Sequence, residues 1–401
     1  QRKLGEVVER ITRKNENLES TLPLTISAQY GLINQNEFFD KRIASKDVSG
    51  YFLVRNGEFA YNKSTSSDAP WGAIKRLDRY ESGVLSTLYI VFKILDERKT
   101  SSDYIVTYYN TDLWHKGIQA IAAEGARNHG LLNVAPADFF ETNLTMPKNY
   151  AEQQQIGSFF QQLDHLITLH QRKYDKLQVL KKAMLEKMFP KNGSSVPEIR
   201  FKGFTDAWEQ RKLGEISEIK TGPFGSILHA DDYVSEGVPI ITTEHFKTGS
   251  LPQNASGLPQ VSEVDYKRLS AYTLNNGDIV FSRVGSVDIN ALVAPFQRNW
   301  LFSGRVLRVR PEIDVLPQFL HTRLETESIK NDICARAVGQ TMPSINTEIL
   351  KATQLVLPTS MAEQKQIGLY FAKLDHLITL HQRELEKLQN IKKSMLEKMF
   401  V

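Results

Sequence analysis

The feature that most constrains this chain is a long segment that occurs twice. Residues 151–189 read AEQQQIGSFFQQLDHLITLHQRKYDKLQVLKKAMLEKMF, and they align without a gap on residues 362–400, AEQKQIGLYFAKLDHLITLHQRELEKLQNIKKSMLEKMF. A shorter repeat precedes each copy, because QRKLGEVVE at Gln1 returns as QRKLGEISE at Gln210. The period of about 210 residues is far longer than the 20 to 50 residues of solenoid repeats. The chain is therefore predicted to be a duplicated unit, in which a variable domain leads into a shared helix.

The apolar residues of both copies alternate steps of four and three, as in a coiled-coil helix. No proline or glycine interrupts the first copy between Gly157 and Pro190, or the second after Gly368. Each helix is therefore expected to run for about 30 to 38 residues, roughly 45 to 57 Å. Such a helix cannot bury its apolar stripe alone, and its natural partner is the other copy in an antiparallel pair. The positions predicted to face the partner are Ile156, Phe160, Leu163, Ile167, His170, Tyr174, Leu177, Leu180, Met184 and Met188, and then Ile367, Phe371, Leu374, Ile378, His381, Leu385, Leu388, Ile391, Met395 and Met399.

The repeated segments also carry polar residues that could have a function. Residues three or four apart share a helix face, so His165 and His170, like His376 and His381, do not form a ligand pair on one face. Interface packing or hydrogen bonding is predicted for them rather than metal binding. The lysines and arginines at the end of each copy suit a helix C-terminus. They form either a solvated face or a docking surface for a partner, and the sequence leaves both readings open.

The variable parts contain short β-rich runs broken by Gly, Asn and Pro, at residues 51–62, 84–95, 238–243, 277–286 and 305–311, and helical stretches at 101–122 and 317–337. The predicted fold class is α+β: two mixed α/β domains separated by an antiparallel pair of long coiled-coil helices, with a pseudo-twofold internal repeat. The expected boundaries are 1–150 for the first domain, 151–189 for the first helix, 190–209 for a linker, 210–361 for the second domain and 362–401 for the second helix.

The composition narrows the class of protein. The chain is 41 % hydrophobic and 24 % charged, with a net charge of +4, as in ordinary globular proteins. No apolar run approaches the roughly 18 to 20 residues of a membrane span, and the start does not read as a signal peptide, so a cytoplasmic location without membrane association is expected. The single cysteine, Cys334, excludes an internal disulfide, and its apolar neighbours predict a buried packing residue. Phosphate-binding loops, dinucleotide fingerprints, amino-methyltransferase motifs and HExxH are absent, so a non-catalytic protein is predicted.

Several segments, taken in order, resemble the specificity subunits of type I restriction-modification systems. In the second half these are PEIRFKGFTDAWEQRKLGE from Pro197, GDIVFSRVGS from Gly277, GQTMPSIN from Gly339, LVLP from Leu355, and the helix that begins EQxxIG and continues through LDxLI. The first half resembles another variant of the same domain through EFAYNKS, GAIKRL, GVLSTLYIVFK and GARNHGLLNV. Each motif is loose, but their order and the duplicated helix are specific. A few residues equivalent to FTDAW are expected to precede Gln1.

The resemblance implies a function and partners. It implies two target recognition domains, each of which reads one half of a split, asymmetric site in double-stranded DNA. The two helices would set the spacer and dock two copies of a methyltransferase subunit. The chain would have no cofactor of its own, because S-adenosylmethionine would be bound by the methyltransferase subunits. Restriction and translocase subunits could join the same complex.

Polar residues in the matching motifs are the predicted DNA contacts, since Arg, Lys, Asn and Gln can read base edges or hold phosphates. In the first domain they are Asn62, Lys63, Ser64, Lys75, Arg76, Arg127, Asn128 and His129; in the second they are Thr221, Ser226, Thr243, Arg283, Gln340 and Thr341. No catalytic residue and no metal ligand is predicted. The alternatives are a coiled-coil scaffold whose end domains bind proteins, and a DNA methyltransferase or nuclease with an unrecognised active site.

Overall fold

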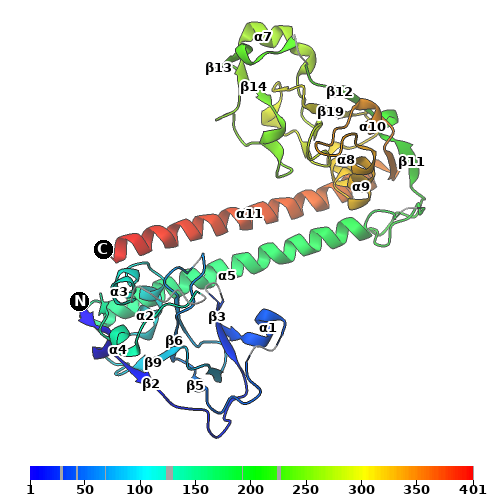
Figure 1. Ribbon diagram of the computed structural model, residues 1–401. Helices are drawn as coiled ribbons and strands as arrows, with labels where there is room; N and C mark the ends of the chain where they lie inside the picture. Colours follow the sequence, from blue (N-terminus) through cyan, green and yellow to red (C-terminus); the bar gives the residue numbers. More distant parts are fainter. Residues whose placement is uncertain are drawn as a thin grey trace. The chain divides into compact units, whose positions relative to one another are not determined.

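A computed structural model describes residues 1–27, 30–41, 44–67, 69–122, 130–191, 193–223 and 227–400 (Figure 1). It divides the chain into two compact units. Unit 1 is Gln1–Gln171 with Arg383–Val401, and unit 2 is Arg172–Gln382. Both divisions fall inside the long helices. Each unit therefore contains one variable domain, the start of one long helix and the end of the other.

Unit 1 is built on a four-stranded antiparallel sheet in the order β2-β9-β6-β7. The predicted runs 51–62 and 84–95 each divide into two strands. One face of the sheet is buried against α2, α4 and the start of α5, where Phe59, Phe92 and Phe139 form an aromatic core. The strands are β1 (Arg2–Lys3), β2 (Val8–Ile11), β3 (Leu24–Ser27), β4 (Gly31–Asn34), β5 (Phe52–Arg55), β6 (Phe59–Asn62), β7 (Ala73–Arg76), β8 (Ser82–Leu85), β9 (Ile90–Ile94) and β10 (Asn143–Leu144). The short helices are η1 (Leu4–Glu6), α1 (Gln35–Phe39), α2 (Ser102–Tyr109), α3 (His115–Ile121) and α4 (Pro136–Phe140).

Unit 2 repeats this frame with the antiparallel sheet β12-β19-β16-β17, and adds a second sheet, β13-β15-β14-β18. Leu307 and Val309 of β19 point into the core beneath α8, whereas Arg308 and Arg310 point to the other face. The strands are β11 (Glu209–Lys212), β12 (Ser217–Thr221), β13 (Tyr233–Val234), β14 (Val238–Ile241), β15 (Gln260–Val261), β16 (Ile279–Ser282), β17 (Asn290–Leu292), β18 (Leu301–Phe302), β19 (Val306–Pro311) and β20 (Gln354–Leu357). The helices are α6 (Leu213–Ile216), η3 (Ala230–Asp232), η4 (Thr243–Phe246), α7 (Glu263–Arg268), η5 (Ser270–Tyr272), η6 (Pro295–Gln297), α8 (Pro317–Leu324), α9 (Glu327–Arg336) and α10 (Thr347–Lys351).

The two predicted long helices are present as α5 (Tyr150–Lys187, 38 residues) and α11 (Met361–Met399, 39 residues). Within unit 1, Phe160 near the start of α5 lies beside Phe400 at the end of α11, with ring centroids 6.4 Å apart. Within unit 2, Phe371 near the start of α11 lies beside Phe189 just after α5, at 6.0 Å. Each unit thus pairs the start of one helix with the end of the other, which confirms the antiparallel arrangement.

The predicted seam is wrong near the helix ends. Leu180, Met395 and Met399 are exposed, whereas the lysines one residue after Leu180 and Ile391 turn inward. Lys181 pairs with Asp375 at 2.7 Å, and Lys392 with Asp164 at 2.5 Å. The apolar pattern alone could not reveal these ion pairs between helices. Of the four histidines in the repeats, His170 and His381 are half-buried, and His165 and His376 are exposed.

The start of each long helix is held to its domain in the same way. The Gln153 side chain accepts a hydrogen bond from Ser101 N and donates to the carbonyls of Lys99 and Pro147. The equivalent Gln364 accepts from Leu316 N and donates to the carbonyls of Asp314 and Pro358. All six partners are backbone groups. Both glutamines are buried, and a buried polar atom without a hydrogen bond costs free energy. These bonds avoid that cost.

Described residues of the segment predicted as a linker, 190–209, contact α11: Arg200 donates to both oxygens of Glu363, at 2.7 and 2.8 Å, and Trp208 is buried beside them. One further expectation is wrong, because Cys334 is exposed, not buried. Helix α9 turns Ile329 and Ile333 into the core, and the residue after Ile333 points to the outer face.

Candidate nucleic-acid interface

In both units the strand at the centre of the candidate site begins at an Asn-Gly-acid turn. Gly57 and Gly277 have φ of +84° and +90°, a backbone conformation that favours glycine. The acid that follows closes the turn: Glu58 accepts from Arg55 N, and Asp278 accepts from Asn275 N, both at 2.7 Å. The turn therefore fixes where β6 and β16 start, and with them the residues that follow each strand.

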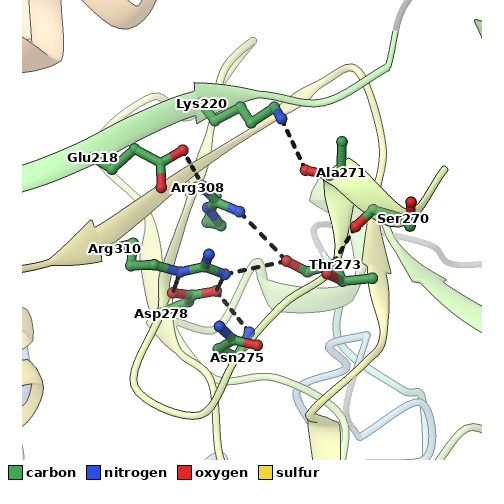
Figure 2. Close-up of polar contacts among 9 residues, drawn as sticks. All are labelled: Glu218, Lys220, Ser270, Ala271, Thr273, Asn275, Asp278, Arg308 and Arg310. Carbon is green, nitrogen blue, oxygen red and sulfur yellow. Dashed lines mark hydrogen bonds and ion pairs between the residues drawn. The ribbon is translucent and has the colours of Figure 1, made fainter.

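An arginine holds each of these buried carboxylates. Arg13 donates to Glu58 at 2.8 and 3.0 Å, and Arg310 donates two bonds of 2.8 Å to Asp278. Figure 2 shows the unit 2 arrangement: Arg308 and Arg310 project from β19 toward the carbonyl of Thr273, and Arg308 also binds Glu218 on β12. Burial and the neighbouring Arg310 lower the pKa of Arg308. These contacts tie the loop 270–275 to the sheet.

The residues that follow β16 form the exit loop of unit 2, residues 283–286. Arg283 N donates to Arg305 O, and Arg283 O accepts from Ile345 N, both at 2.9 Å. Gly285 N donates to Pro343 O at 2.8 Å. The exit loop is thus fixed against residues 338–346, a segment that Val338 and Ser344 close with two backbone bonds. Gln340 and Thr341 are exposed at the tip of that segment.

A cavity of ≈ 520 Å³ opens beside the exit loop of unit 2. Two predicted residues, Arg283 and Thr243, line it, together with Arg305 and Ser303, which the sequence analysis did not select. The Arg283 guanidinium donates to Gly304 O at 3.2 Å, and Arg305 is exposed. The hydroxyl of Ser303 is buried and has no hydrogen-bond partner within the described ranges. The cavity therefore offers two guanidinium groups and several hydroxyls to a ligand, beside the carboxylate of Glu244.

Thr221 and Ser226 are two other residues of unit 2 that were predicted to contact DNA. Thr221 ends β12, and its hydroxyl is buried with no hydrogen-bond partner in the described part of the chain. The next residue, Gly222, lies so close to Ser303 that an added Cβ would meet the Ser303 carbonyl oxygen at 2.0 Å. Thr221 is thereby held near the wall of the cavity. Ser226 lies outside the described residues.

The exit loop of unit 1, residues 63–66, is fixed in the same manner. Lys63 O accepts from Leu132 N at 2.9 Å, Thr65 N donates to Gly130 O at 2.7 Å, and Asn62 accepts from Ser64 N at 3.0 Å. Lys63 follows β6 as Arg283 follows β16, and burial lowers its pKa. Three of the predicted residues, Asn62, Lys63 and Ser64, are therefore brought together. Arg127, Asn128 and His129 lie outside the described residues.

Lys75 and Arg76 of β7 bind the domain itself. Lys75 donates to Asn110 at 2.8 Å. Arg76 pairs with Asp78 at 2.6 Å and Asp103 at 2.8 Å. These contacts tie β7 to α2, which favours a structural role for both side chains beside the predicted DNA contact.

The described residues contain no cluster of His, Cys, Asp and Glu that could hold a metal ion, and none of their helices is long and apolar enough to cross a membrane.

Comparisons with known proteins give one consistent result. Residues 205–390 match the family described as the type I restriction modification DNA specificity domain. The type I restriction enzyme MjaVIII specificity subunit of Methanocaldococcus jannaschii is 24 % identical over 331 residues, which are 79 % of this chain and 73 % of that protein. The putative MjaX specificity subunit of the same organism is 28 % identical over 200 residues, 48 % of this chain and 45 % of that protein. The crystal structure of a type I restriction-modification system S subunit from M. genitalium has the same fold, with a TM-score of 0.64, 15 % identity, and coverage of 100 % of this chain and 95 % of that one.

Proposed function

We propose that this chain is the non-catalytic DNA-recognition subunit of a type I restriction-modification complex, because residues 205–390 match the specificity-domain family and the MjaVIII specificity subunit aligns with 79 % of the chain. Each variable domain reads one half of a bipartite, asymmetric site in double-stranded DNA. The long helices dock two methyltransferase subunits, which bring S-adenosylmethionine and the catalytic groups, and the helices set the spacer between the half-sites. Restriction and translocase subunits can join the same complex.

The main support for this proposal is that the two units share a backbone arrangement but carry different side chains on their exit loops. The Asn-Gly-acid turn, the strand after it and the backbone bonds of the exit loop are alike in both. The side chains on the exit loops differ, with Lys63 and Ser64 in one and Arg283 and Val284 in the other. A shared frame that presents different side chains suits two domains that read different half-sites.

Within this proposal, Arg283, Thr243, Gln340 and Thr341 face DNA in the second domain, joined by Arg305; Asn62, Lys63 and Ser64 do so in the first. Arg283 and Arg305 line one cavity and can reach a guanine edge or a phosphate. Lys63 offers a compact charge for a phosphate. The remaining predicted residues, Thr221, Ser226, Arg127, Asn128, His129, Lys75 and Arg76, stay predictions.

Substitution at the exit loops tests this assignment in the complete complex with its methyltransferase subunits. Arg283→Ala is expected to weaken binding to the DNA site that the complex methylates by about 1 to 3 kcal/mol. If the guanidinium reads a base, the substitution should also relax the requirement for one base pair. Lys202→Ala, an exposed lysine outside both exit loops, is the control and should bind as the wild type does. If the Arg283→Ala complex bound DNA with unchanged affinity, Arg283 would not be a DNA contact.

Two further measurements separate the proposal from the alternatives. Binding to duplex DNA should fall as salt rises, because phosphate contacts release counterions; a coiled-coil scaffold that binds proteins would show no such DNA binding. The purified chain should neither bind S-adenosylmethionine nor methylate DNA by itself. Methylation by the single chain would replace the proposal with the enzyme alternative.

The spacer role has its own test. Four residues inserted after Lys176 and four after Lys387 lengthen both helices by about 6 Å. That length is close to two base-pair steps of roughly 3.4 Å. Because four residues also exceed one helical turn, the insertions are made at matching levels in both helices. The expected enzyme keeps both half-sites with a spacer longer by one or two base pairs. An active enzyme with the original spacer would show that the methyltransferase subunits set the distance.

A further inference from the structure

A second cavity, of ≈ 710 Å³, lies in unit 2, away from the exit loop. Its walls are the last turns of α5 on one side and the turn between α8 and α9 on the other. The volume is within the range of small-molecule sites, about 300 to 1,000 Å³. Five cationic side chains line it: Lys181, Lys182, Lys191, Arg323 and Lys330; three carboxylates, Glu186, Glu325 and Glu327, also do so.

Arg323 is the unusual member of this set. It is only 4 % exposed, and no carboxylate of the described residues lies within ion-pair distance of its guanidinium. Its contacts are a 3.4 Å hydrogen bond to the Thr326 hydroxyl and the ring of Phe189, 5.4 Å from the guanidinium carbon; Nε has no partner within the described ranges. Burial lowers the pKa of Arg323 to about 10. A buried charge without a counterion is costly, so this geometry calls for an anion.

The other groups at the cavity suit a phosphate. Helix α9 has 10 residues, and the side chain of its N-cap, Thr326, makes no capping hydrogen bond, so Thr326 leaves the first backbone N–H groups uncapped; Glu327 is the acidic residue of this first turn. Ser328 adds a hydroxyl. Lys181 pairs with two carboxylates, Glu325 at 2.9 Å and Asp375 at 2.7 Å, whereas Lys182 and Lys330 have no ion pair with a described residue. An arginine, lysines, a helix N-terminus and a hydroxyl together form the set of donors that three phosphate oxygens accept.

The internal repeat supplies a comparison within the same chain. Gly157 faces Asp103 and Tyr104, and Gly368 faces Gln318 and Phe319, which aligns α2 with α8 and places Tyr108 where unit 2 has Arg323. Tyr108 lies beside Phe400, at 6.3 Å, as Arg323 lies beside Phe189. Where the domain meets the long helix, unit 1 therefore has a tyrosine and not a cation at the position of Arg323. A cation at this position is not needed for the packing.

From this geometry we infer that the cavity between the end of α5 and the α8–α9 turn binds a small phosphate-bearing molecule, one per chain. The phosphate lies against Arg323 and the N-terminus of α9, with Lys182 and Lys330 beside it. The remaining volume takes the organic part of the molecule. This site is separate from the surfaces that face DNA, and it stands whether or not the proposed function holds.

Titration of the full chain with inorganic phosphate in a chloride buffer tests the site, by isothermal calorimetry and by the thermal unfolding midpoint. The expected result is one saturable site and a midpoint that rises with phosphate, since a ligand of the folded state stabilises it. Arg323→Met keeps an apolar side chain over Phe189 and should weaken binding at least tenfold. A nucleoside monophosphate should bind to the same site at least as tightly as phosphate does.

Matched lysine variants keep the test decisive if Arg323→Met does not fold. Lys182→Met, on the cavity wall, should weaken phosphate binding several-fold. Lys393→Met, the repeat equivalent at the end of α11, should leave it unchanged. Absence of saturable binding, or equal losses for the two lysine variants, would overturn the inference. So would displacement of phosphate by short duplex DNA in proportion to its concentration, because the cavity would then belong to the DNA-binding surface.

Discussion

The two joints between a variable domain and its long helix use the same repeated residues with unequal results. Gln153 and Gln364 make the same three hydrogen bonds, and all their partners are backbone groups, which any sequence supplies. Glu363, one residue earlier, binds the side chains of Arg200 and Trp208. Its repeat equivalent, Glu152, is exposed and makes no ion pair with a described residue. The hydrogen bonds of the two glutamines to backbone groups are therefore the part of the joint that is the same in both units.

Two ion pairs between the helix copies are also the same in both units. Lys181 with Asp375 and Lys392 with Asp164 are equivalent pairs, because both members belong to the repeat. Their surroundings differ: Glu325 adds a second carboxylate to Lys181, whereas Lys75 lies near Asp164 and Lys392. The two ion pairs are therefore equivalent, and their surroundings differ where the helices meet the variable domains.

The largest difference in stability between the two joints is expected at Glu363 and Glu152. Glu363→Ala leaves the Arg200 guanidinium, 12 % exposed, without its buried partner, and is expected to lower the free energy of unfolding by about 3 to 5 kcal/mol. Glu152→Ala removes an exposed side chain and should change it by less than about 0.5 kcal/mol. Urea denaturation of the full chain, followed by circular dichroism, measures both. Similar losses in the two variants would show that Glu152 has an equivalent role.

A smaller difference is expected at the glycines where each long helix crosses its domain. A Cβ on Gly157 would meet the backbone and Cβ of Asp103 at 2.7 Å, whereas one on Gly368 would meet Gln318 and Phe319 no closer than 3.1 Å. Gly157→Ala should therefore lower stability by about 1 to 3 kcal/mol through overpacking. For Gly368→Ala, the better helix propensity of alanine, about 1 kcal/mol, offsets most of the strain. If the thermal midpoints of both variants fell equally, the two crossings would be equally tight.

The smallest effect concerns pH and is expected at His321 of unit 2. Burial lowers the pKa of His321, and Glu325, Lys181, Asp375 and Lys330 are the charged groups around it. Because the unfolded chain takes up the proton first, stability should be constant above about pH 6.5 and fall as the pH drops below it, by at most about 1.4 kcal/mol per pH unit for one proton. His321→Gln should remove this part of the pH dependence, and His376→Gln, at an exposed position, should not. The contrary finding would be equal pH profiles for wild type and His321→Gln.

The sequence predicted the parts of the fold that depend on periodicity and repetition. The steps of four and three located both long helices, and the Gly-bounded β-rich runs located β6, β9, β16 and β19. It could not place Lys181 and Lys392 inside the helix pair, because charged residues are read as exposed until their partners are known. Cys334 was misjudged for a related reason: apolar neighbours in sequence point to other faces of a helix.

The candidate site was predictable only where a motif fixes the backbone. The residues after β6 and β16 were selected, and Lys63 and Arg283 occupy equivalent positions. Arg305 and Ser303 were missed, because they reach the cavity from the turn between β18 and β19 and carry no motif of their own. The sequence did not identify Arg323 as a candidate site residue either, because its burial depends on how the helices pack where the domain meets the long helix.

The central claim is that the two variable domains read DNA independently while the repeated helices serve both. The most direct test is to replace residues 1–150 by the first domain of another family member, combine the chimera with the methyltransferase subunits, and map methylated sites by sequencing. The account predicts that one half-site changes and that the other half-site and the spacer stay as they were. A change in both half-sites, or in neither, would contradict it.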